Sequence, residues 1–250
     1  MLTGKTMLIT GGGRGIGLAI AEKARDAGAS LILTGRSESS VRDAAERLGV
    51  RAMAVDFADR ASIEAFLVAL EAVPVDVLIN NAGIAESAPV HRTDDAMFDR
   101  IFQVNVHGPF ALTRALLPKM IARGFGRVVN IASNAGRAGY AYTTAYCASK
   151  HAVVGMTRAI ATEIARTPVT INAVCPGWVN TDMSREATQR IADKTKRTQA
   201  EAEAELAAMS PQRRLIEPTE VAHLVLSLCA PDARGIHGQS IVLDGGQLMT

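Results

Sequence analysis

Short apolar runs alternate with longer amphipathic segments along the whole chain. The apolar runs are mostly free of polar residues and rich in Val, Ile and Leu. Runs that are apolar on both faces are typical of parallel strands covered by helices on both sides. We therefore predict seven strands, over residues 7–10, 31–34, 51–55, 75–79, 127–131, 170–175 and 240–243.

The segments between these runs have a helical period, which predicts helices over 16–27, 39–48, 62–71, 95–123, 149–166 and 219–230. This strict alternation predicts an α/β fold. We expect a single Rossmann-like, doubly wound domain over residues 1–250, with a seven-stranded parallel sheet and helices on both faces.

One stretch, residues 183–214, breaks the rhythm, because it is polar, rich in Ala, Glu, Lys and Arg, and strongly helix-forming. It follows the carboxyl end of a predicted strand, where ligands of open α/β sheets bind. We interpret it as a helical lid over a site. A solvated surface excursion is the alternative.

The composition excludes several classes of protein. A hydrophobic fraction of 48% indicates an ordered globular chain, and 27 Lys and Arg against 25 Asp and Glu is too even a balance for a nucleic-acid-binding protein. No apolar stretch approaches the roughly 20 residues of a membrane span, and the N-terminus lacks a signal-peptide pattern. Cys147, Cys175 and Cys229 form no CxxC pair. We therefore expect a cytoplasmic protein without disulfides, a metal site, or nucleic-acid or membrane partners.

A glycine-rich turn, Thr10-Gly-Gly-Gly-Arg-Gly-Ile-Gly17, follows the first predicted strand and precedes a helix. Its spacing is G-x-x-x-G-x-G rather than the usual dinucleotide fingerprint G-x-G-x-x-G. Glycines let the backbone approach a ligand closely, and a helix N-terminus suits a pyrophosphate. The expected cofactor contacts in this turn are Gly11, Gly13, Arg14, Gly15, Ile16 and Gly17.

The end of the second strand indicates which cofactor binds. A site for NAD places an acidic residue there to bond the ribose 2′-hydroxyl, whereas this chain has Arg36 in Thr-Gly-Arg-Ser. Arg36 and Arg14 are suited to a 2′-phosphate, so we predict NADP(H) as the preferred cofactor, with NAD(H) as the alternative. Glu38 would reverse this preference if its loop folded back. Both arginines could also be ordinary surface residues.

Polar and small residues end two further strands. Asn81, Ala82 and Gly83 follow the fourth strand, where small residues leave room for a ribose and Asn81 can bond neighbouring backbone groups. Asp56, followed by Phe57, ends the third strand and is placed to accept a bond from an adenine amino group. Each of these features is as compatible with ordinary turn chemistry.

The sharpest candidates for catalysis are Tyr146 and Lys150, which share one helix face at i and i+4. A nearby cation and an oxidised nicotinamide ring would lower the pKa of Tyr146, making it a general acid for a ketone or a base for an alcohol. Ser133, just past the fifth strand, can hold the substrate oxygen. Asn105, inside a long predicted helix, either holds a water that relays protons to Lys150 or satisfies a helix kink.

Taken together, these motifs resemble the short-chain dehydrogenase/reductase family over essentially the full length. The resemblance rests on Thr10–Gly17, Asn80–Gly83, Asn105, Ser133, Tyr146/Lys150, Pro176-Gly177-Trp178-Val179-Asn180-Thr181 and Asp244-Gly245-Gly246. It implies a catalytic tetrad of Asn105, Ser133, Tyr146 and Lys150, with Tyr146 and Lys150 also touching the cofactor. It further implies a homotetramer and cofactor contacts from Pro176, Gly177, Val179 and Thr181.

Residues 148–176 are similar to aromatic polyketide ketoreductases, 3-oxoacyl-thioester reductases and 3-hydroxybutyrate dehydrogenases. The last group grips a free carboxylate with polar side chains at positions that here are Ala85, Ala135 and Thr143, which argues against a small hydroxy acid. We therefore expect hydride transfer to a ketone, best a 3-oxoacyl thioester on acyl carrier protein or coenzyme A. The expected pocket residues are Ser133, Tyr140, Tyr142, Trp178 and Met183.

Two groups of basic residues are candidates for contacts with the carrier. Arg123, Arg127 and Arg166 could meet an acidic carrier protein. A coenzyme A phosphate could be met by five basic residues of segment 183–214: Arg185, Arg190, Lys194, Lys196 and Arg197. Such residues are more often solvating charge on a surface.

Two other functions stay open. The first is an NAD-dependent dehydrogenase of a cyclic, aromatic or hydroxyacyl-CoA secondary alcohol. The second, from a different class, is a nucleotide-binding sensor without catalysis. The presence of Ser133, Tyr146 and Lys150 together argues against the sensor, because a protein that does not catalyse has no need of all three.

Overall fold

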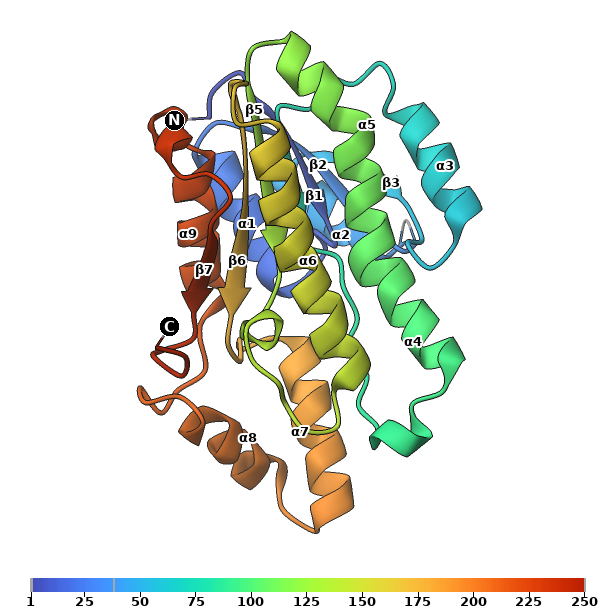
Figure 1. The fold of residues 1–250 in the computed structure, drawn as a ribbon, viewed down its shortest axis with the longest axis vertical. Helices are drawn as coiled ribbons and strands as arrows, with labels where there is room; N and C mark the ends of the chain where they lie inside the picture. Colours follow the sequence, from blue (N-terminus) through green and yellow to red (C-terminus); the bar gives the residue numbers. More distant parts are fainter. Residues whose placement is uncertain (1, 38, 250) are drawn as a thin grey trace.

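A seven-stranded parallel sheet forms the centre of the computed structural model, which describes residues 2–37 and 39–249 (Figure 1). The strand order is β3-β2-β1-β4-β5-β6-β7. The chain thus builds the sheet outward from β1 in one direction, then returns to β4 and builds it in the other. Such a reversal opens a crevice at the carboxyl ends of the strands. The predicted doubly wound, Rossmann-like sheet is confirmed.

All seven predicted strands are present, each within two residues of the expected bounds. They are β1 Thr6–Thr10, β2 Ser30–Gly35, β3 Arg51–Ala54, β4 Val77–Asn80, β5 Gly126–Ile131, β6 Val169–Pro176 and β7 Ser240–Leu243. Every residue of β4, β5 and β6 is buried. The mostly apolar pattern of these strands therefore has the cause we expected, which is helices on both faces.

Two hydrophobic cores lie on opposite faces of the sheet. Helices α1 (Gly15–Asp26), α2 (Ser39–Leu48) and α9 (Pro218–Cys229) pack against one face, and α3 (Arg60–Ala69), α5 (Gly108–Ala122) and α6 (Thr144–Glu163) against the other. Neighbouring strand residues alternate between the two cores: Ile9 belongs to the first and Leu8 to the second. The helix layers hold the sheet rigid, so that the loops at its carboxyl edge are presented from a fixed base.

The single helix predicted over 95–123 is wrong, because the structure divides it into three parts. Helix α4 (Asp95–Phe102) is followed by a π-helical turn, Gln103–His107, and then by α5. Pro109 explains the division: it has no N–H to donate to the carbonyl of Asn105, and its ring would clash with that carbonyl in a regular helix. The N–H of Gly108 instead bonds the carbonyl of Gln103, five residues back.

Helix α6 begins at Thr144 rather than at the predicted residue 149, so that Tyr146 lies inside its first turn. This earlier start places Tyr146 and Lys150 on the same helix, as their four-residue spacing requires.

The segment 183–214 is helical, as predicted. It forms α7 (Asp182–Thr195) and α8 (Gln199–Ala208), which lie beyond the carboxyl tips of β6 and β7 (Figure 1). Each helix starts with a capping box, Thr181 with Ser184 and Thr198 with Glu201. The chain then returns to the sheet through a bridge between Val179 and Ile216. Across residues 2–37 and 39–249, no helix is long and apolar enough to cross a membrane.

Candidate active site

The four residues predicted to act in catalysis lie at the carboxyl edge of the sheet or on helices beside it. Ser133 follows β5, Asn105 lies in the π turn, and Tyr146 and Lys150 lie on α6. The ammonium of Lys150 reaches across to β5 and donates to the carbonyl of Ile131 at 2.8 Å. This bond brings α6 against the strand that leads to Ser133.

The hydroxyl of Ser133 faces that of Tyr146. Burial raises the pKa of Tyr146 above its ordinary value, and the neighbouring Ser133 hydroxyl opposes this rise. The lowering expected from a nearby cation is therefore not found in the protein alone, and the lowering expected from an oxidised nicotinamide ring stays a prediction. Lys150 is the cation that was expected to lower this pKa. Its nitrogen lies 5.7 Å from the centre of the Tyr146 ring and donates a hydrogen bond to the carbonyl of Ile131.

Lys150 is itself strongly affected by its surroundings. Only 6% of the residue is exposed. Burial lowers its pKa from 10.5 to about 8, with the nearby Cys175 acting in the opposite sense. A lysine in this state still carries its charge for most of the time at neutral pH, yet releases a proton far more readily than one in water.

The Asn105 amide joins two elements beside the site. Its Oδ1 accepts from the N–H of Ile84 at 2.9 Å, and its Nδ2 donates to the carbonyl of Ile84 at 2.9 Å and to the hydroxyl of Ser149 at 3.1 Å. The side chain therefore bonds the backbone after β4 rather than that of its own helix. Oδ1 of Asn105 and Nζ of Lys150 both lie beside Gly83, within 3.3 and 3.7 Å of where its Cβ would be.

The glycine-rich turn packs tightly against the end of β4. Gly11 has a φ of +65°, a conformation that favours glycine. A Cβ at Gly17 would collide with the carbonyl oxygen of Gly11 and lie 2.6 Å from Nδ2 of Asn81. That amide donates to the carbonyls of Thr10 at 2.9 Å and Gly11 at 3.1 Å. Asn81 thus bonds neighbouring backbone, as expected, and shapes the turn that precedes α1.

The two arginines predicted to read the cofactor differ in their surroundings. Arg36 is exposed at the end of β2. Arg14 is also exposed, but its guanidinium lies 3.7 Å from Asp182 and 3.6 Å from Glu186, both on α7. The glycine turn and α7 are therefore linked by ion pairs. Glu38, the acid that would reverse the cofactor preference, lies outside the described residues.

The structure gives Asp56 a turn role. Its Oδ1 accepts from the N–H of Ala58 at 2.9 Å, and its own N–H donates to the hydroxyl of Ser62 at 2.9 Å. The ring of Phe57 is buried and packs where a Cβ at Gly108 would stand. The side chain of Phe57 is therefore directed to the core, and a contact with a cofactor would have to use its backbone.

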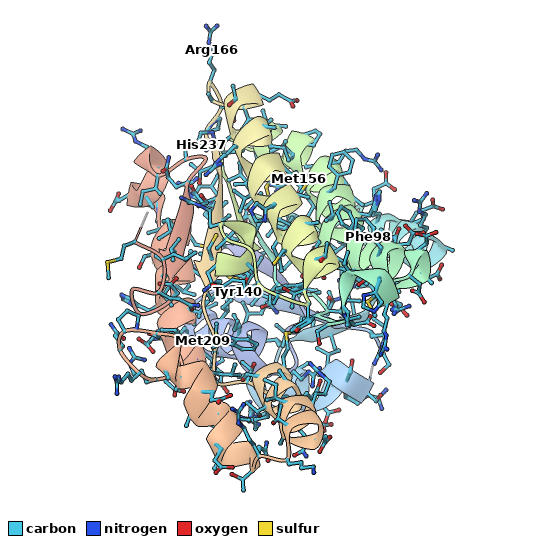
Figure 2. The ribbon with its side chains drawn as sticks, turned by 60° about the horizontal axis from the view of Figure 1, so that its bottom comes forward. Phe98, Tyr140, Met156, Arg166, Met209 and His237 are labelled. Atoms are coloured by element: carbon cyan, nitrogen blue, oxygen red, sulfur yellow. The ribbon has the colours of Figure 1, made fainter. Side chains whose placement is uncertain are left out.

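The residues expected to line a substrate pocket differ in how far they are exposed. Tyr142 is 65% exposed and Met183 is 40% exposed, whereas Trp178 is half-buried. Tyr140 lies in the loop before α6 (Figure 2). Its hydroxyl is buried and has no hydrogen-bond partner in the described structure.

Two nearby residues were missed from the sequence as site candidates: Asn134 and Gln247. The amides of Asn134 and Gln247 are joined by a hydrogen bond of 3.1 Å, and Asn134 directly follows Ser133. Gln247 comes just after β7, at the same sheet edge as the other candidates. That position was the signal available, because residues that follow parallel strands gather at one edge.

The proposed carrier contact at Arg127 is wrong. Only 3% of Arg127 is exposed, and its guanidinium donates to four backbone carbonyls, those of Gly126, Pro168, Ala230 and Pro231. Arg123 bonds the carbonyl of Val75 and lies 3.7 Å from Asp76. Arg166 extends from the end of the molecule opposite α7 and α8 (Figure 2). These arginines therefore lie far from the candidate site of the same chain.

No metal site is evident: among the described residues, no group of three or more His, Cys, Asp or Glu side chains is placed to hold a metal ion.

Comparison with known proteins gives consistent matches over nearly the whole chain. The family model described as short chain dehydrogenase matches residues 5–192. The 3-oxoacyl-(acyl-carrier-protein) reductase FabG of Vibrio cholerae is 36% identical over 252 residues, covering 99% of each chain. The D-beta-hydroxybutyrate dehydrogenase of Cupriavidus necator is 34% identical over 254 residues, covering 98% of each. The crystal structure of a single-substitution variant of actinorhodin polyketide ketoreductase with NADPH superposes with a TM-score of 0.92 at 36% identity, covering 99% of each.

Proposed function

This chain is an oxidoreductase that belongs to the short-chain dehydrogenase family, and we propose on that premise that it reduces the 3-oxo group of a ketoacyl thioester with NADPH. One observation carries the proposal: Ser133 and Tyr146 present their hydroxyls to each other, with Lys150 buried beside them, at the sheet edge where the glycine turn also lies.

In this mechanism the Ser133 and Tyr146 hydroxyls hold the carbonyl oxygen of the substrate. The raised pKa of Tyr146 keeps the phenol protonated at neutral pH, which suits a residue that donates its proton to the forming alkoxide. Lys150 retains a proton below about pH 8 and replaces the one that Tyr146 loses. The relay between them passes through a water held near Asn105 and Gly83.

The residues of the glycine turn fit a dinucleotide. Gly11 to Gly17 form a turn without bulky side chains, and the first N–H groups of α1 have no partner within their own helix. When bound there, NADPH supplies the hydride. Arg36 and Arg14 would hold its 2′-phosphate, Arg14 by exchanging Asp182 and Glu186 for it.

A thioester fits the substrate side better than a small hydroxy acid. Ala85, Ala135 and Thr143 offer no charge to a free carboxylate. In this proposal the exposed side chains of Tyr142 and Met183 lie at the mouth of the substrate site, and the carrier remains outside. The names of two relatives, a ketoacyl-type reductase and a polyketide ketoreductase, point to the same class. In this proposal α7 and α8 form a lid over the substrate.

We further propose that the protein is a cytoplasmic homotetramer. Support comes from α4 and α5, where Phe98 and Phe102 stack with their ring centres 4.7 Å apart, while Phe98 and Phe110 are 37% and 42% exposed. Aromatic side chains on a helix surface suit packing against a second copy of the chain.

The test is a comparison of substrates and cofactors, read by the absorbance of the nicotinamide. The purified protein is mixed with acetoacetyl coenzyme A, simple ketones and secondary alcohols, including 3-hydroxybutyrate, and with NADPH, NADH and their oxidised forms. We expect the fastest turnover with the thioester and NADPH. Turnover confined to an alcohol with NAD⁺ would favour the dehydrogenase alternative, which the similarity to D-beta-hydroxybutyrate dehydrogenase keeps in view. Cofactor binding without any turnover would favour a sensor.

A further inference from the structure

The chain after β7 forms a tight turn, residues 244–248, around a buried carboxylate. Asp244 is 4% exposed. Its Oδ1 accepts from the N–H groups of Gly246 at 3.1 Å and Gln247 at 3.0 Å, and its Oδ2 accepts from that of Leu248 at 2.9 Å. Hydrogen bonds to a carboxylate are stronger than neutral ones, so this turn is a rigid element.

The turn lies directly against the residue that follows the catalytic serine. Nδ2 of Asn134 donates to Oε1 of Gln247 at 3.1 Å, and Asn134 is 6% exposed. At Gly177, where β6 has just ended, a Cβ would lie 2.8 Å from the Cβ of Asp244 and 3.6 Å from Nδ2 of Asn134. The absence of a side chain at Gly177 is what lets the turn and Asn134 meet.

The Asn134 amide also contacts Ser133. The Ser133 hydroxyl donates to Oδ1 of Asn134 at 3.4 Å and accepts from the N–H of Ala135 at 3.1 Å. An amide offers donors at one end and an acceptor at the other. Because Gln247 presents an oxygen to Nδ2, the oxygen of Asn134 is turned toward Ser133.

The length of the bond between Ser133 and Asn134 is chemically useful. Hydroxyl-to-oxygen bonds are usually about 2.7–2.8 Å long, so a bond of 3.4 Å is weak. Asn134 therefore directs the hydroxyl without trapping its hydrogen. A substrate carbonyl oxygen can take over this hydrogen while the N–H of Ala135 keeps the serine oxygen in place.

We propose that Asn134 and Gln247 are positioning residues for the reaction: Gln247 orients the Asn134 amide, and that amide orients the Ser133 hydroxyl toward the substrate oxygen. The turn 244–248 is thereby part of the active site. This inference rests on the proposed function, in which Ser133 holds the substrate carbonyl.

The same turn is connected to the lid and to Tyr140. The hydroxyl of Ser210, which follows α8, donates to the carbonyl of Gly245 at 3.2 Å. The unpartnered hydroxyl of Tyr140 faces Gln247. A substrate held by α7, α8 and Tyr140 is therefore connected, through these contacts, to the turn 244–248 that orients Ser133.

The experiment compares Gln247→Met and Asn134→Ala with Gln239→Met, a matched control at the opposite end of β7. Single-turnover reduction of acetoacetyl coenzyme A by NADPH is measured, together with kcat, KM and the Kd for NADPH. We expect Gln247→Met and Asn134→Ala each to lower the rate about tenfold, with the Kd and melting temperature nearly unchanged. The double variant should be no slower than either single one, because both act through one contact. Gln239→Met should match the unaltered protein.

The decisive comparison uses a Ser133→Ala background. A residue that acts only through the serine hydroxyl has nothing to orient there, so adding Gln247→Met or Asn134→Ala should change the rate no further. An unchanged tenfold loss in that background, or full activity of both single variants, would overturn the positioning role. If Ser133→Ala alone keeps full activity, the proposed function of the site fails instead. The two failures are thus distinguishable.

Discussion

The ammonium nitrogen of Lys150 lies 2.8 Å from the carbonyl oxygen of Ile131, the last residue of β5. The contact buries a cation next to a strand in order to place it beside Tyr146. Its cost is visible in the pKa of Lys150, which burial lowers to about 8. Burial of the Lys150 ammonium therefore destabilises the folded protein, although the same burial places the cation beside Tyr146.

The lowered pKa of Lys150 predicts how the free energy of unfolding depends on pH. Below about pH 8 the lysine is protonated in both states, and the folded protein bears the cost of the buried charge. Between about pH 8 and its ordinary pKa of 10.5, the unfolded chain holds the proton while the folded protein has released it, so stability rises with pH. From about pH 7.5 to 10, the free energy of unfolding should rise by about 2 kcal/mol relative to Lys150→Met. Urea titrations of both proteins measure this difference, and parallel pH profiles would contradict the prediction.

Replacing the proposed proton donor should stop turnover without disturbing the cofactor. Tyr146→Phe removes only the hydroxyl, and loss of a general acid typically costs about 10² to 10⁴ in rate. We expect the Kd for NADPH, measured by fluorescence titration, to stay within about twofold. Thr162→Val is the control, since it removes an exposed hydroxyl from the same helix, α6, and it should remain active. A Tyr146→Phe protein with normal turnover would disprove the assignment.

Arg36 should discriminate between the two nicotinamide cofactors. It is an exposed arginine at the end of β2, suited to a 2′-phosphate that only NADPH carries. Arg36→Ala should raise the KM for NADPH by about tenfold and leave that for NADH nearly unchanged. Arg166→Ala, at the opposite end of the molecule, serves as the control. Equal effects on both cofactors would show that Arg36 reads no phosphate.

Replacement by alanine should change the stability of the protein in opposite directions at two glycines that lie in helices. A Cβ at Gly17 would strike the carbonyl oxygen of Gly11, whereas nothing lies within 4 Å of a Cβ at Gly155 in α6. We expect Gly17→Ala to destabilise the protein by about 1–3 kcal/mol and weaken NADPH binding. Gly155→Ala should stabilise it by up to about 1 kcal/mol, because alanine is the better helix former. Thermal unfolding of the two variants distinguishes these outcomes, and a similar shift in both would argue against the packing explanation.

Much of the fold follows from local pattern. The strands are recognisable because both faces of β4 and β5 are buried and therefore mostly apolar. The site candidates follow from the rule that residues after parallel strands share one edge. The break at Pro109 is a local signal that the helical period of 95–123 concealed.

The remaining features depend on contacts that no local pattern records. Asn134 and Gln247 are 113 residues apart, and the pairing of β5 with β6 and of β6 with β7 brings them together. The burial of Arg127 is equally impossible to predict from the sequence, because its partners are backbone carbonyls, which every residue possesses. The raised pKa of Tyr146 depends on how much protein surrounds it, and helical spacing alone says nothing of that.

The π turn at Gln103–His107 requires a fixed number of residues between α4 and α5. Each residue of an α-helix rotates the chain by about 100°. Deleting one residue from the turn would therefore rotate α5 relative to α4, and either Asn105 would swing away from Ile84 or the buried face of α5 would swing away from the sheet. The same five positions can accept changes of side chain far more readily than a change in their number. An insertion or deletion here would act on catalysis as directly as the loss of a catalytic side chain.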